Sequence, residues 1–329
     1  MDIKILLLIL VPLSTGFLIP LIDLINAKLR RVFVLLGIFL ESYLIISIII
    51  NNFQKLKNGD FFLKYYLGGW HPPLGISLAM DGLSLLFVVI TALSLFLIVI
   101  YSIGYIGHHE GKYYVLYFLI AAASMGAILT ADLFNIYVFI EMLTITSGAL
   151  IGFKRSKEAS AAAIKYLIYN VLAGLLFFLA VLLVYFNLGT LNMADIAQSF
   201  GSLGSRMQLF ISSIFLTSIL IKMGIFPFFF WLPKSYDTAP SPVTAVLSGI
   251  LSKVYLYIFI RIFWTVVGFE SLTALNLDIF ILDLALISSF LGHVFALQSD
   301  NIKRLLGYSS IGHIGMILAV IMLNTDAGF

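Results

Sequence analysis

Apolar residues fill ten long stretches of the chain, and short polar connections separate them. The stretches lie near residues 3–22, 32–50, 83–103, 113–129, 133–151, 159–188, 209–230, 243–267, 279–297 and 302–323. Each is close to the roughly 20 residues that a helix needs to cross a bilayer. The runs are continuous and do not alternate every second residue, which favours helices over the strands of a membrane barrel. The pattern predicts an all-α polytopic membrane protein with about ten transmembrane helices.

The composition excludes several other classes of protein. The 329 residues are 61% hydrophobic and only 11% charged, whereas about 25% of a soluble domain is charged. Ten spans leave no room for a soluble cofactor domain. Cysteine is absent, which excludes disulfides and Cys-ligated metal centres and puts any iron–sulfur chemistry on another chain. The net charge of +3 is scattered and lacks the basic clustering of a nucleic-acid surface.

The basic residues predict an orientation. The first stretch has no small-residue cleavage pattern and is read as a retained helix, so ten spans put both termini on one side of the membrane. Ten Lys and Arg residues fall on the opposite side and six, Arg261 among them, on the terminal side. Because basic loops stay inside, we expect a multi-pass cell-membrane protein whose termini lie outside.

The two longest connections both lie on the terminal side. In residues 51–80, Gly68, Gly69 and Gly75 lie close to Trp70 together with two prolines, which suits an extended turn or a hairpin. Residues 189–206 place Met193, Ile196, Phe200 and Leu203 at spacings of three and four. This spacing predicts a short amphipathic helix on the membrane surface.

Once the basic residues near the connections are counted, three lysines are left inside the predicted spans, and Glu141 joins them in the middle of its span; the four are Glu141, Lys165, Lys222 and Lys253. Each costs about 2.5–3.5 kcal/mol at a helix centre, so the four together would cost roughly 10 kcal/mol if unpaired. We therefore expect them to be paired, hydrated or neutral.

Buried lysine is suited to handling protons. Desolvation favours the neutral amine, and an approaching carboxylate favours the ammonium, so moving the carboxylate moves a proton. We expect this chemistry of Glu141 with Lys222 and Lys253. Three hydroxyl side chains stand at helical spacing from these residues and offer a hydrated path: Thr144, Ser218 and Tyr257.

The seventh stretch also contains a predicted helix break. Gly224 and Pro227 closely follow Lys222, and proline lacks an N–H and disfavours helix in the preceding residue. A broken helix is tolerated at membrane depth only where its freed carbonyls face protein or water. Such breaks mark ion sites in transporters.

Simpler interpretations stand beside these. Lys222 and Lys165 each lie near a helix end, from which a long side chain can snorkel to the interface. Glu41 is as central in its span as Glu141, and it either pairs with a neighbouring subunit or marks a misplaced boundary. His293 and His313 have no second ligand at helical spacing, which indicates structural groups rather than a metal site. Both also remain candidate relay members.

Four segments carry a resemblance to a known family. They read GGWHPPLGI at 68–76 with Asp81, DLFNIYVFIE at 132–141, IKMGIFP at 221–227 with WLP and PSPVTA after it, and DNIKRLLGYSSIGH at 300–313. Together they resemble the antiporter-like subunits of respiratory complex I, membrane-bound hydrogenases and Mrp cation/proton antiporters. The first segment is most similar to the D-type branch of the Mrp subunits.

This resemblance implies inverted five-helix repeats, each with a broken helix and a buried lysine, that pass protons or exchange them for sodium. Glu141 matches the glutamate of helix five, Lys222 the lysine of the broken helix seven and Lys253 the relay lysine of helix eight. Lys303 and His313 fall in a motif of the second repeat. The resemblance also divides the chain into three parts. These are three N-terminal helices with an outer loop (1–106), a first repeat of helices four to eight (107–267) and the start of a second repeat (268–329). The second broken helix would lie beyond residue 329.

The expected function is therefore that of an ion-translocating subunit in a multisubunit membrane complex, either an Mrp-type exchanger or a complex-I-like redox pump such as a hydrogenase. Its partners would be other membrane subunits, the lipid bilayer, protons and, in an exchanger, sodium ions, but no nucleic acid. We expect no cofactor, metal or catalytic centre on this chain. One alternative is a non-conducting structural or coupling subunit of such an oxidoreductase. Another is an independent carrier of a small solute.

Overall fold

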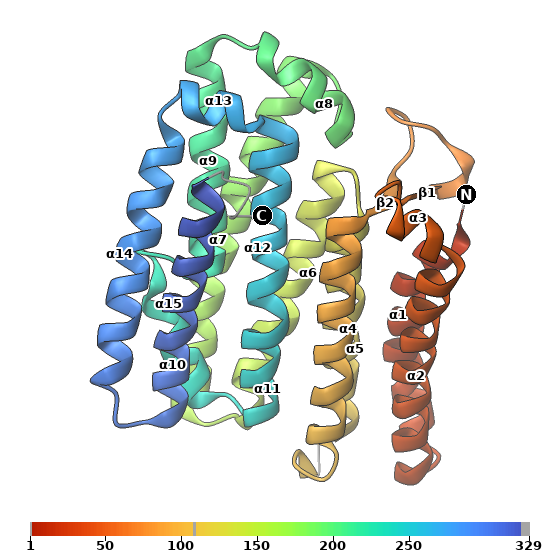
Figure 1. Cartoon of the computed structure of the whole chain (residues 1–329). Coiled ribbons are helices and arrows are strands. Elements are labelled where there is room, and N and C mark those ends of the chain that lie inside the picture. Colours follow the sequence, from red (N-terminus) through yellow and green to blue (C-terminus); the bar gives the residue numbers. More distant parts are fainter. Residues whose placement is uncertain (1, 108–109, 324–329) are drawn as a thin grey trace.

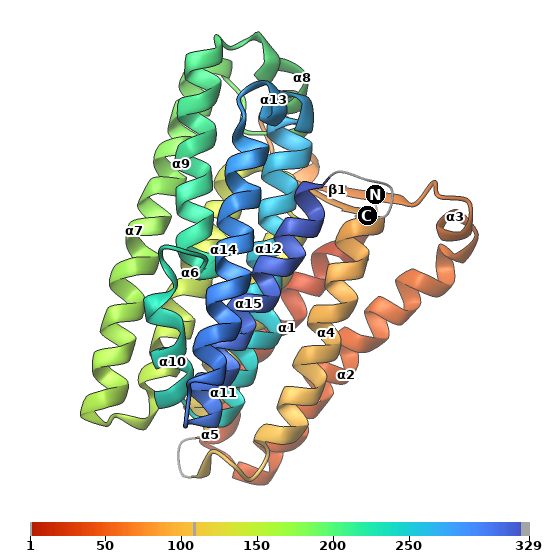
Figure 2. The same ribbon diagram turned by 60° about the vertical axis from the view of Figure 1, so that its left-hand side comes forward.

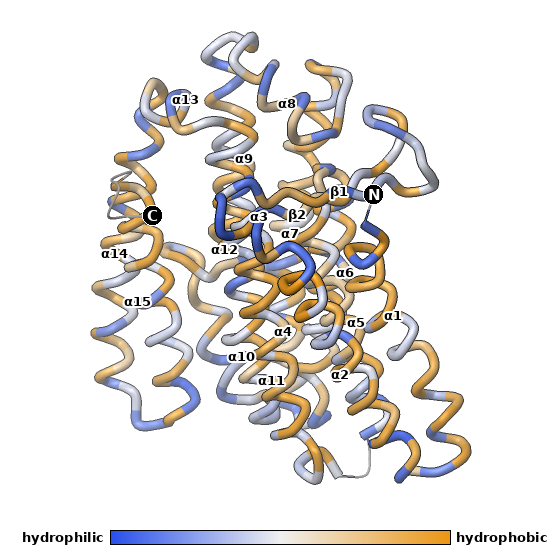
Figure 3. The backbone as a smooth tube through the Cα atoms, turned by 45° about the vertical axis from the view of Figure 1, so that its right-hand side comes forward, coloured by the Kyte–Doolittle hydropathy of each residue, from blue (hydrophilic) through white to orange (hydrophobic). Residues whose placement is uncertain are grey.

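The computed structural model describes residues 2–107 and 110–323 and is 82% helical. Long helices stand side by side, and their connections gather at two ends of the molecule (Figure 1). Hydrophobic residues dominate the lengths of the helices, and hydrophilic residues concentrate toward the ends and connections (Figure 3). This arrangement confirms the prediction of an all-α polytopic membrane protein.

All ten predicted spans are confirmed by helices of sufficient length and hydropathy. They are α1 Ile3–Asp23, α2 Ala27–Asn51, α4 Gly82–Ser102, α5 Glu110–Leu129, α6 Leu133–Ile151 (extended by η3 Gly152–Lys154), α7 Lys157–Leu188, α9 Ser205–Met223, the composite helix Ser241–Val267, α14 Leu277–Leu297 and α15 Ile302–Met322. The composite helix consists of α11 Ser241–Val246, α12 Ser252–Ile260 and two π-helical segments, η6 Leu247–Leu251 and η7 Arg261–Val267.

The helices form a wide bundle. Helices α1 and α2 lie at one edge and α14 and α15 at the other (Figure 1). In the turned view α14 and α15 stand in front of the bundle, between α9 and α4 (Figure 2). Helix α1 packs against α2 and α5, α7 packs against α6 and α9, and α14 packs along α15. The most buried spans are α5 and the composite helix, where 78% of an 18-residue apolar stretch lies inside the protein in both cases.

The connection 51–80 folds as the predicted hairpin. After the short α3 Phe53–Lys57, strands β1 Phe62–Tyr66 and β2 Ser77–Asp81 pair antiparallel, with Phe62 opposite Asp81. The hairpin, α8 Met193–Ser199 and α13 Phe269–Ala274 lie at the end of the bundle where α1 begins (Figure 1). We call this end the N-terminal face.

Helix α8 forms where an amphipathic helix was predicted, but its apolar side does not face outward. Met193 and Ile196, with Phe200 just after the helix, are each less than 9% exposed. Helix α8 and η4 Phe200–Ser202 contact η7 instead. The apolar spacing therefore reflects packing onto the bundle, which buries the same surface that a membrane would.

The seventh span breaks where it was predicted to, although it does not continue to Phe230. Helix α9 ends at Met223, and Gly224 adopts φ 67°, a left-handed conformation that glycine adopts without steric cost. The chain then turns through η5 Phe229–Trp231 into the short helix α10 Leu232–Thr238. The division of the chain at residues 106 and 267 stays a prediction, and residues 324–329 of its last part lie outside the described residues.

Candidate functional site

Lys222 lies in the last turn of α9 with its side chain 1% exposed. Its Nζ atom donates to Thr144 Oγ1 at 2.9 Å, to the backbone carbonyl of Asn170 at 2.9 Å and to Glu141 Oε1 at 3.4 Å. These acceptors come from α6 and α7, so three helices meet at this amine. An ammonium has three N–H donors, and each finds an acceptor. The structure excludes snorkelling of Lys222 to the interface.

Glu141 lies in the middle of α6 and is the only charged partner of Lys222 among the described residues. Its side chain is 21% exposed. Phe134, Val138 and Ile145 occupy the same helical stripe and are exposed by 40%, 43% and 63%. The carboxyl therefore borders the outer side of α6, whereas its partner is enclosed by protein.

Polar groups without a hydrogen-bond partner surround the pair. Asn170 donates to the Tyr166 carbonyl, but its Oδ1 atom is buried without a partner. The Tyr255 ring lies 5.9 Å from Lys222 Nζ, and its hydroxyl is also unpartnered. Buried polar atoms of this kind are the usual partners of ordered water. The surroundings of Lys222 can therefore be hydrated.

The break after Lys222 leaves no backbone carbonyl facing lipid at Leu220 or Ile221. The Ile221 carbonyl accepts from Trp231 Nε1 at 3.0 Å, and the Leu220 carbonyl accepts from Ile225 N at 3.0 Å. The Phe226 N–H donates to Ser288 Oγ of α14 at 2.9 Å. The freed groups thus face protein, as a broken helix at membrane depth requires.

Lys253 lies at the start of α12 and is partly buried. Its Nζ donates to the Ser248 carbonyl at 2.7 Å and to Ser252 Oγ at 3.3 Å. A cavity of about 10 Å³ lies between the helices and is lined by Lys222, Ser252 and Tyr255. This is close to the smallest space that holds a water molecule. Ser252 therefore contacts both the cavity next to Lys222 and the amine of Lys253.

The structure does not bring Lys165 to this site. Its side chain is on the exposed side of α7, with no hydrogen bond or ion pair to any described residue. This position fits a lysine that snorkels from a helix to the interface.

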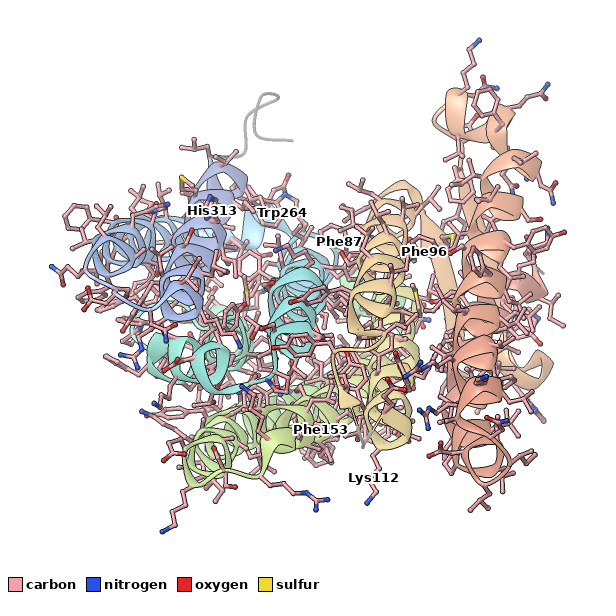
Figure 4. The ribbon with its side chains drawn as sticks, turned by 90° about the horizontal axis from the view of Figure 1, so that it is seen from below. Phe87, Phe96, Lys112, Phe153, Trp264 and His313 are labelled. Carbon is pink, nitrogen blue, oxygen red and sulfur yellow. The ribbon has the colours of Figure 1, made fainter. Side chains whose placement is uncertain are left out.

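Three further candidate relay residues, His293, Lys303 and His313, lie on α14 and α15, in the part of the chain predicted to begin a second repeat. Lys303 donates to the Ala239 carbonyl at 2.8 Å. His293 and His313 lie together, with 5.4 Å between ring centroids, and each Nδ1 is 2.7 Å from a carbonyl of its own helix. Figure 4 shows His313 on the side of the bundle away from α1 and α2. Among the described residues, neither histidine hydrogen-bonds to Lys253.

Two of the three expected path hydroxyls serve other contacts. Thr144 binds Lys222 as the spacing predicted, but Ser218 donates to the Ala173 carbonyl. Tyr257 donates to the Ile128 carbonyl and accepts from Arg261. The helical periodicity identified the polar face correctly. The hydrogen-bond partners of Ser218 and Tyr257, however, are set by packing against α7 and α5.

The count of basic residues treated Arg261 as a loop residue, but Arg261 lies inside the composite helix. It lies in η7 and pairs with Asp81, which also caps α4 through Ser84. Burial raises the pKa of the Asp81 carboxyl, but hydrogen bonds from Arg261 and Ser84 and the Arg261 charge outweigh burial, so the pKa lies below its ordinary value. The pair borders a pocket of about 330 Å³ at the N-terminal face, which also contacts Tyr257.

Both alternatives for Glu41 are wrong. Glu41 lies well inside α2, so no boundary is misplaced. It is only 1% exposed within the chain and cannot pair with a neighbouring subunit. Its burial depends on how α1 and α4 pack on α2, which the sequence pattern does not reveal.

No group of three His, Cys, Asp or Glu side chains gathers as a metal site within residues 2–107 and 110–323. The site described above consists of amine, carboxyl, hydroxyl and amide groups. Such groups hold and pass protons. That the chain carries no cofactor stays a prediction.

The comparison with family models gives one match. Residues 130–329 match the family described as NADH:quinone oxidoreductase/Mrp antiporter, transmembrane. This segment contains Glu141, Lys222 and Lys253, and it covers more than half of the chain.

Similar curated proteins come from two kinds of complex. The D subunit of the Na(+)/H(+) antiporter of Alkalihalophilus pseudofirmus is 32% identical over 97% of this chain. The N subunit of the NADH-quinone oxidoreductase of Desulforudis audaxviator is 32% identical over 78% of this chain. The matches cover 64% and 52% of those relatives, so this chain spans less than two-thirds of the length of either one.

Two solved structures share the fold. A chain of the membrane-bound sulfane sulfur reductase, an archaeal respiratory membrane complex, superposes with a TM-score of 0.89 at 28% identity and covers 97% of this chain and 65% of its own length. A chain of the Mrp complex from Dietzia gives a TM-score of 0.86 at 23% identity and covers 100% of this chain and 60% of its own. Both structures are multisubunit membrane complexes.

Proposed function

The chain belongs to the NADH:quinone oxidoreductase/Mrp antiporter family of membrane subunits, and from that premise we propose that it translocates protons within a multisubunit membrane complex. The observation that carries this proposal is the buried Lys222 ammonium, whose single charged partner among the described residues is Glu141. Its companions in the complex would be other membrane subunits, as in the Mrp and sulfane sulfur reductase complexes. The bias of basic residues supports termini that face outward.

The proposed mechanism starts at Glu141. While its carboxylate lies 3.4 Å from Nζ, the lysine holds its proton, because the opposite charge stabilises the ammonium. A cation brought to the outer side of α6, or a proton bound by Glu141, weakens that attraction. Lys222 then keeps only two neutral acceptors, Thr144 and the Asn170 carbonyl. A buried ammonium without a charged partner is costly, so Lys222 releases its proton.

The contacts around Lys222 support a route for the released proton toward Lys253. The cavity beside Lys222 reaches Ser252, which contacts Lys253. One water in this cavity would carry the proton to the Ser252 hydroxyl, which would pass its own proton to Lys253 in its neutral amine form. When Glu141 regains its charge, Lys222 takes up a new proton and the cycle repeats. His293, His313 and Lys303 are candidates for a later part of the route on α14 and α15.

The test uses the native complex that contains this chain, reconstituted into liposomes with a pH-sensitive dye inside. We expect Lys222→Ala to lower proton transport by about a hundredfold, the typical effect of losing a proton-transfer group. Lys157→Ala, at the exposed start of α7, is the matched control and should transport normally. Repeating the assay with and without a sodium gradient shows whether protons are exchanged for sodium.

A normal rate for Lys222→Ala in a fully assembled complex would contradict the proposal. It would favour the structural or coupling role, in which the chain holds its neighbours in place without conducting. Assembly is checked in the same preparation by the ratio of this chain to its companion subunits.

A further inference from the structure

Glu41 is a second ionisable group enclosed at membrane depth, and the mechanism above does not use it. It lies in α2, is 1% exposed, and its Oε1 atom is buried without a hydrogen-bond partner. One turn before it, a Cβ at Gly37 would meet Thr15 of α1 and Phe118 of α5. Helices α1 and α5 therefore enclose α2 tightly at this level.

The side chains that face Glu41 leave it without a cation. Helix α5 offers Tyr117, which interacts electrostatically with Glu41 and whose hydroxyl donates to the Leu95 carbonyl of α4. Helix α1 offers Thr15, which donates to its own helix, and α4, which packs on α2, has no charged residue. The one lysine of α1, Lys4, binds Ser47 near the end of α2. A carboxylate without a cationic partner is costly in such a place, so a carboxyl there binds a proton.

A row of tyrosines leads away from Glu41 along α5. The Tyr117 ring lies 5.9 Å from that of Tyr113, which lies 5.2 Å from that of Tyr114. The Tyr113 hydroxyl is buried without a partner, and the Tyr114 hydroxyl accepts from Ser102 Oγ at 3.2 Å. Both hydroxyl groups therefore have free hydrogen-bonding capacity inside the protein.

The row ends at a charged cluster on the face opposite the N-terminal face. Tyr114 interacts electrostatically with Glu110, the first residue of α5. Glu110 pairs with Arg30 at 2.5 Å and with Arg31 at 2.9 Å. The Arg31 side chain is 46% exposed, so the cluster meets solvent. Lys112, the nearby cation of α5, stands at the periphery and points outward (Figure 4).

We propose that Glu41 is a second proton-binding site, loaded through Tyr114, Tyr113 and Tyr117 from the face where Glu110 lies. In this route the Tyr117 O–H turns from the Leu95 carbonyl to Glu41. Each hydroxyl accepts a proton on one side and gives its own on the other, so no charge stays on a tyrosine. The step forms one O–H bond on the Glu41 carboxylate and takes one proton from solvent. The site is separate from the Glu141 and Lys222 pair and does not depend on the role proposed for that pair.

The test is infrared spectroscopy of the native complex with this chain carrying glutamate labelled with ¹³C at the side-chain carboxyl. The chain has five glutamates, so the label distinguishes their bands from those of aspartate. We expect a protonated-carboxyl band that loses intensity as pH rises and shifts in D₂O. Glu41→Gln should remove this band, and Glu270→Gln, at an exposed position of α13, should leave it.

Tyr117→Phe tests the route and keeps the carboxyl in place. The variant should retain the band but slow its exchange in D₂O severalfold, because the hydroxyl next to Glu41 is gone. Tyr117→Phe also keeps the proposal testable if the Glu41→Gln complex does not assemble. The proposal is overturned if the band is absent from the wild type, persists in Glu41→Gln, ignores pH, or exchanges at the wild-type rate in Tyr117→Phe.

Discussion

Lys222 and Glu141 form one ion pair, with 3.4 Å between Nζ and Oε1, but their side chains have different surroundings. The lysine is 1% exposed and the glutamate 21%. In the proposed mechanism, a charge that arrives beside α6 therefore acts on Glu141 first. Lys222 responds only after Glu141 has been neutralised, so the proposal gives the two residues a fixed order of events.

Gly174 offers a way to move the carboxyl without changing it. An added Cβ at Gly174 of α7 would overlap with Glu141 Oε1. We predict that Gly174→Ala displaces the carboxylate from Lys222 and lowers proton transport by about tenfold to a hundredfold, as misplaced proton-transfer groups do. The measurement is transport in liposomes, with Gly201→Ala as control because a Cβ there meets open space. A wild-type rate in Gly174→Ala would show that the carboxyl position is unimportant.

Ser252 tests the step toward Lys253. Ser252→Ala removes the hydroxyl that contacts both the cavity and the lysine amine. We expect a severalfold slower transport with unchanged assembly. Ser248→Ala is the matched control, because its hydroxyl bonds only within its helix and it does not line the cavity. Equal rates for the two variants would exclude this route.

Lys165 tests whether a lysine must be buried to take part in the proton relay, or whether any lysine inside a span does so. Its exposed side chain has no described partner, so Lys165→Ala should change the transport rate by less than about twofold, as surface substitutions away from a site do. The measurement is the same liposome assay, run beside Lys222→Ala. A loss as large as that of Lys222→Ala would place Lys165 in the relay after all.

Asp81 and Arg261 predict a dependence of stability on acid. Because the pKa of Asp81 is lowered in the folded protein, its contribution is present above the ordinary value of 3.8 and is lost as pH falls through the lower folded value. Asp81→Asn should cost only about 1 kcal/mol at neutral pH, because solvent screens a carboxyl that is 34% exposed.

The measurement is the temperature of unfolding in detergent at neutral pH and near pH 3, the latter being about one unit below the ordinary pKa of aspartate. The wild type should lose more stability on acidification than Asp81→Asn. Asp60→Asn, at an exposed position, is the control and should behave as the wild type. Equal acid sensitivity of wild type and Asp81→Asn would contradict this assignment.

The sequence predicts the spans well for a physical reason. Continuous apolar runs are needed to cross a bilayer, so every run became a helix, and Gly224 followed by Pro227 marked the break. The predicted end of the seventh span was wrong because the apolar residues after Gly224 are buried in a turn and not in a helix. Apolar composition alone does not distinguish the two.

The candidate site was predictable in part. Glu141 and Lys222 stood out because charge is costly inside an apolar run. The Asn170 carbonyl was missed because any residue supplies a carbonyl, and only the packing of α7 on α9 selects this one. The ion pair of Arg261 with Asp81 was missed because the two residues are 180 residues apart in the chain. Contacts of that kind depend on tertiary packing and leave no local pattern.

The most direct test of the central claim is a double-mutant cycle on the ion pair. Proton transport is measured in liposomes for the assembled complex with Glu141→Ala, with Lys222→Ala and with both changes. If the two groups act as one unit, each single change lowers transport strongly and the double variant is no slower than the slower single variant. Losses that multiply, or a normal rate in either single variant, would contradict the account.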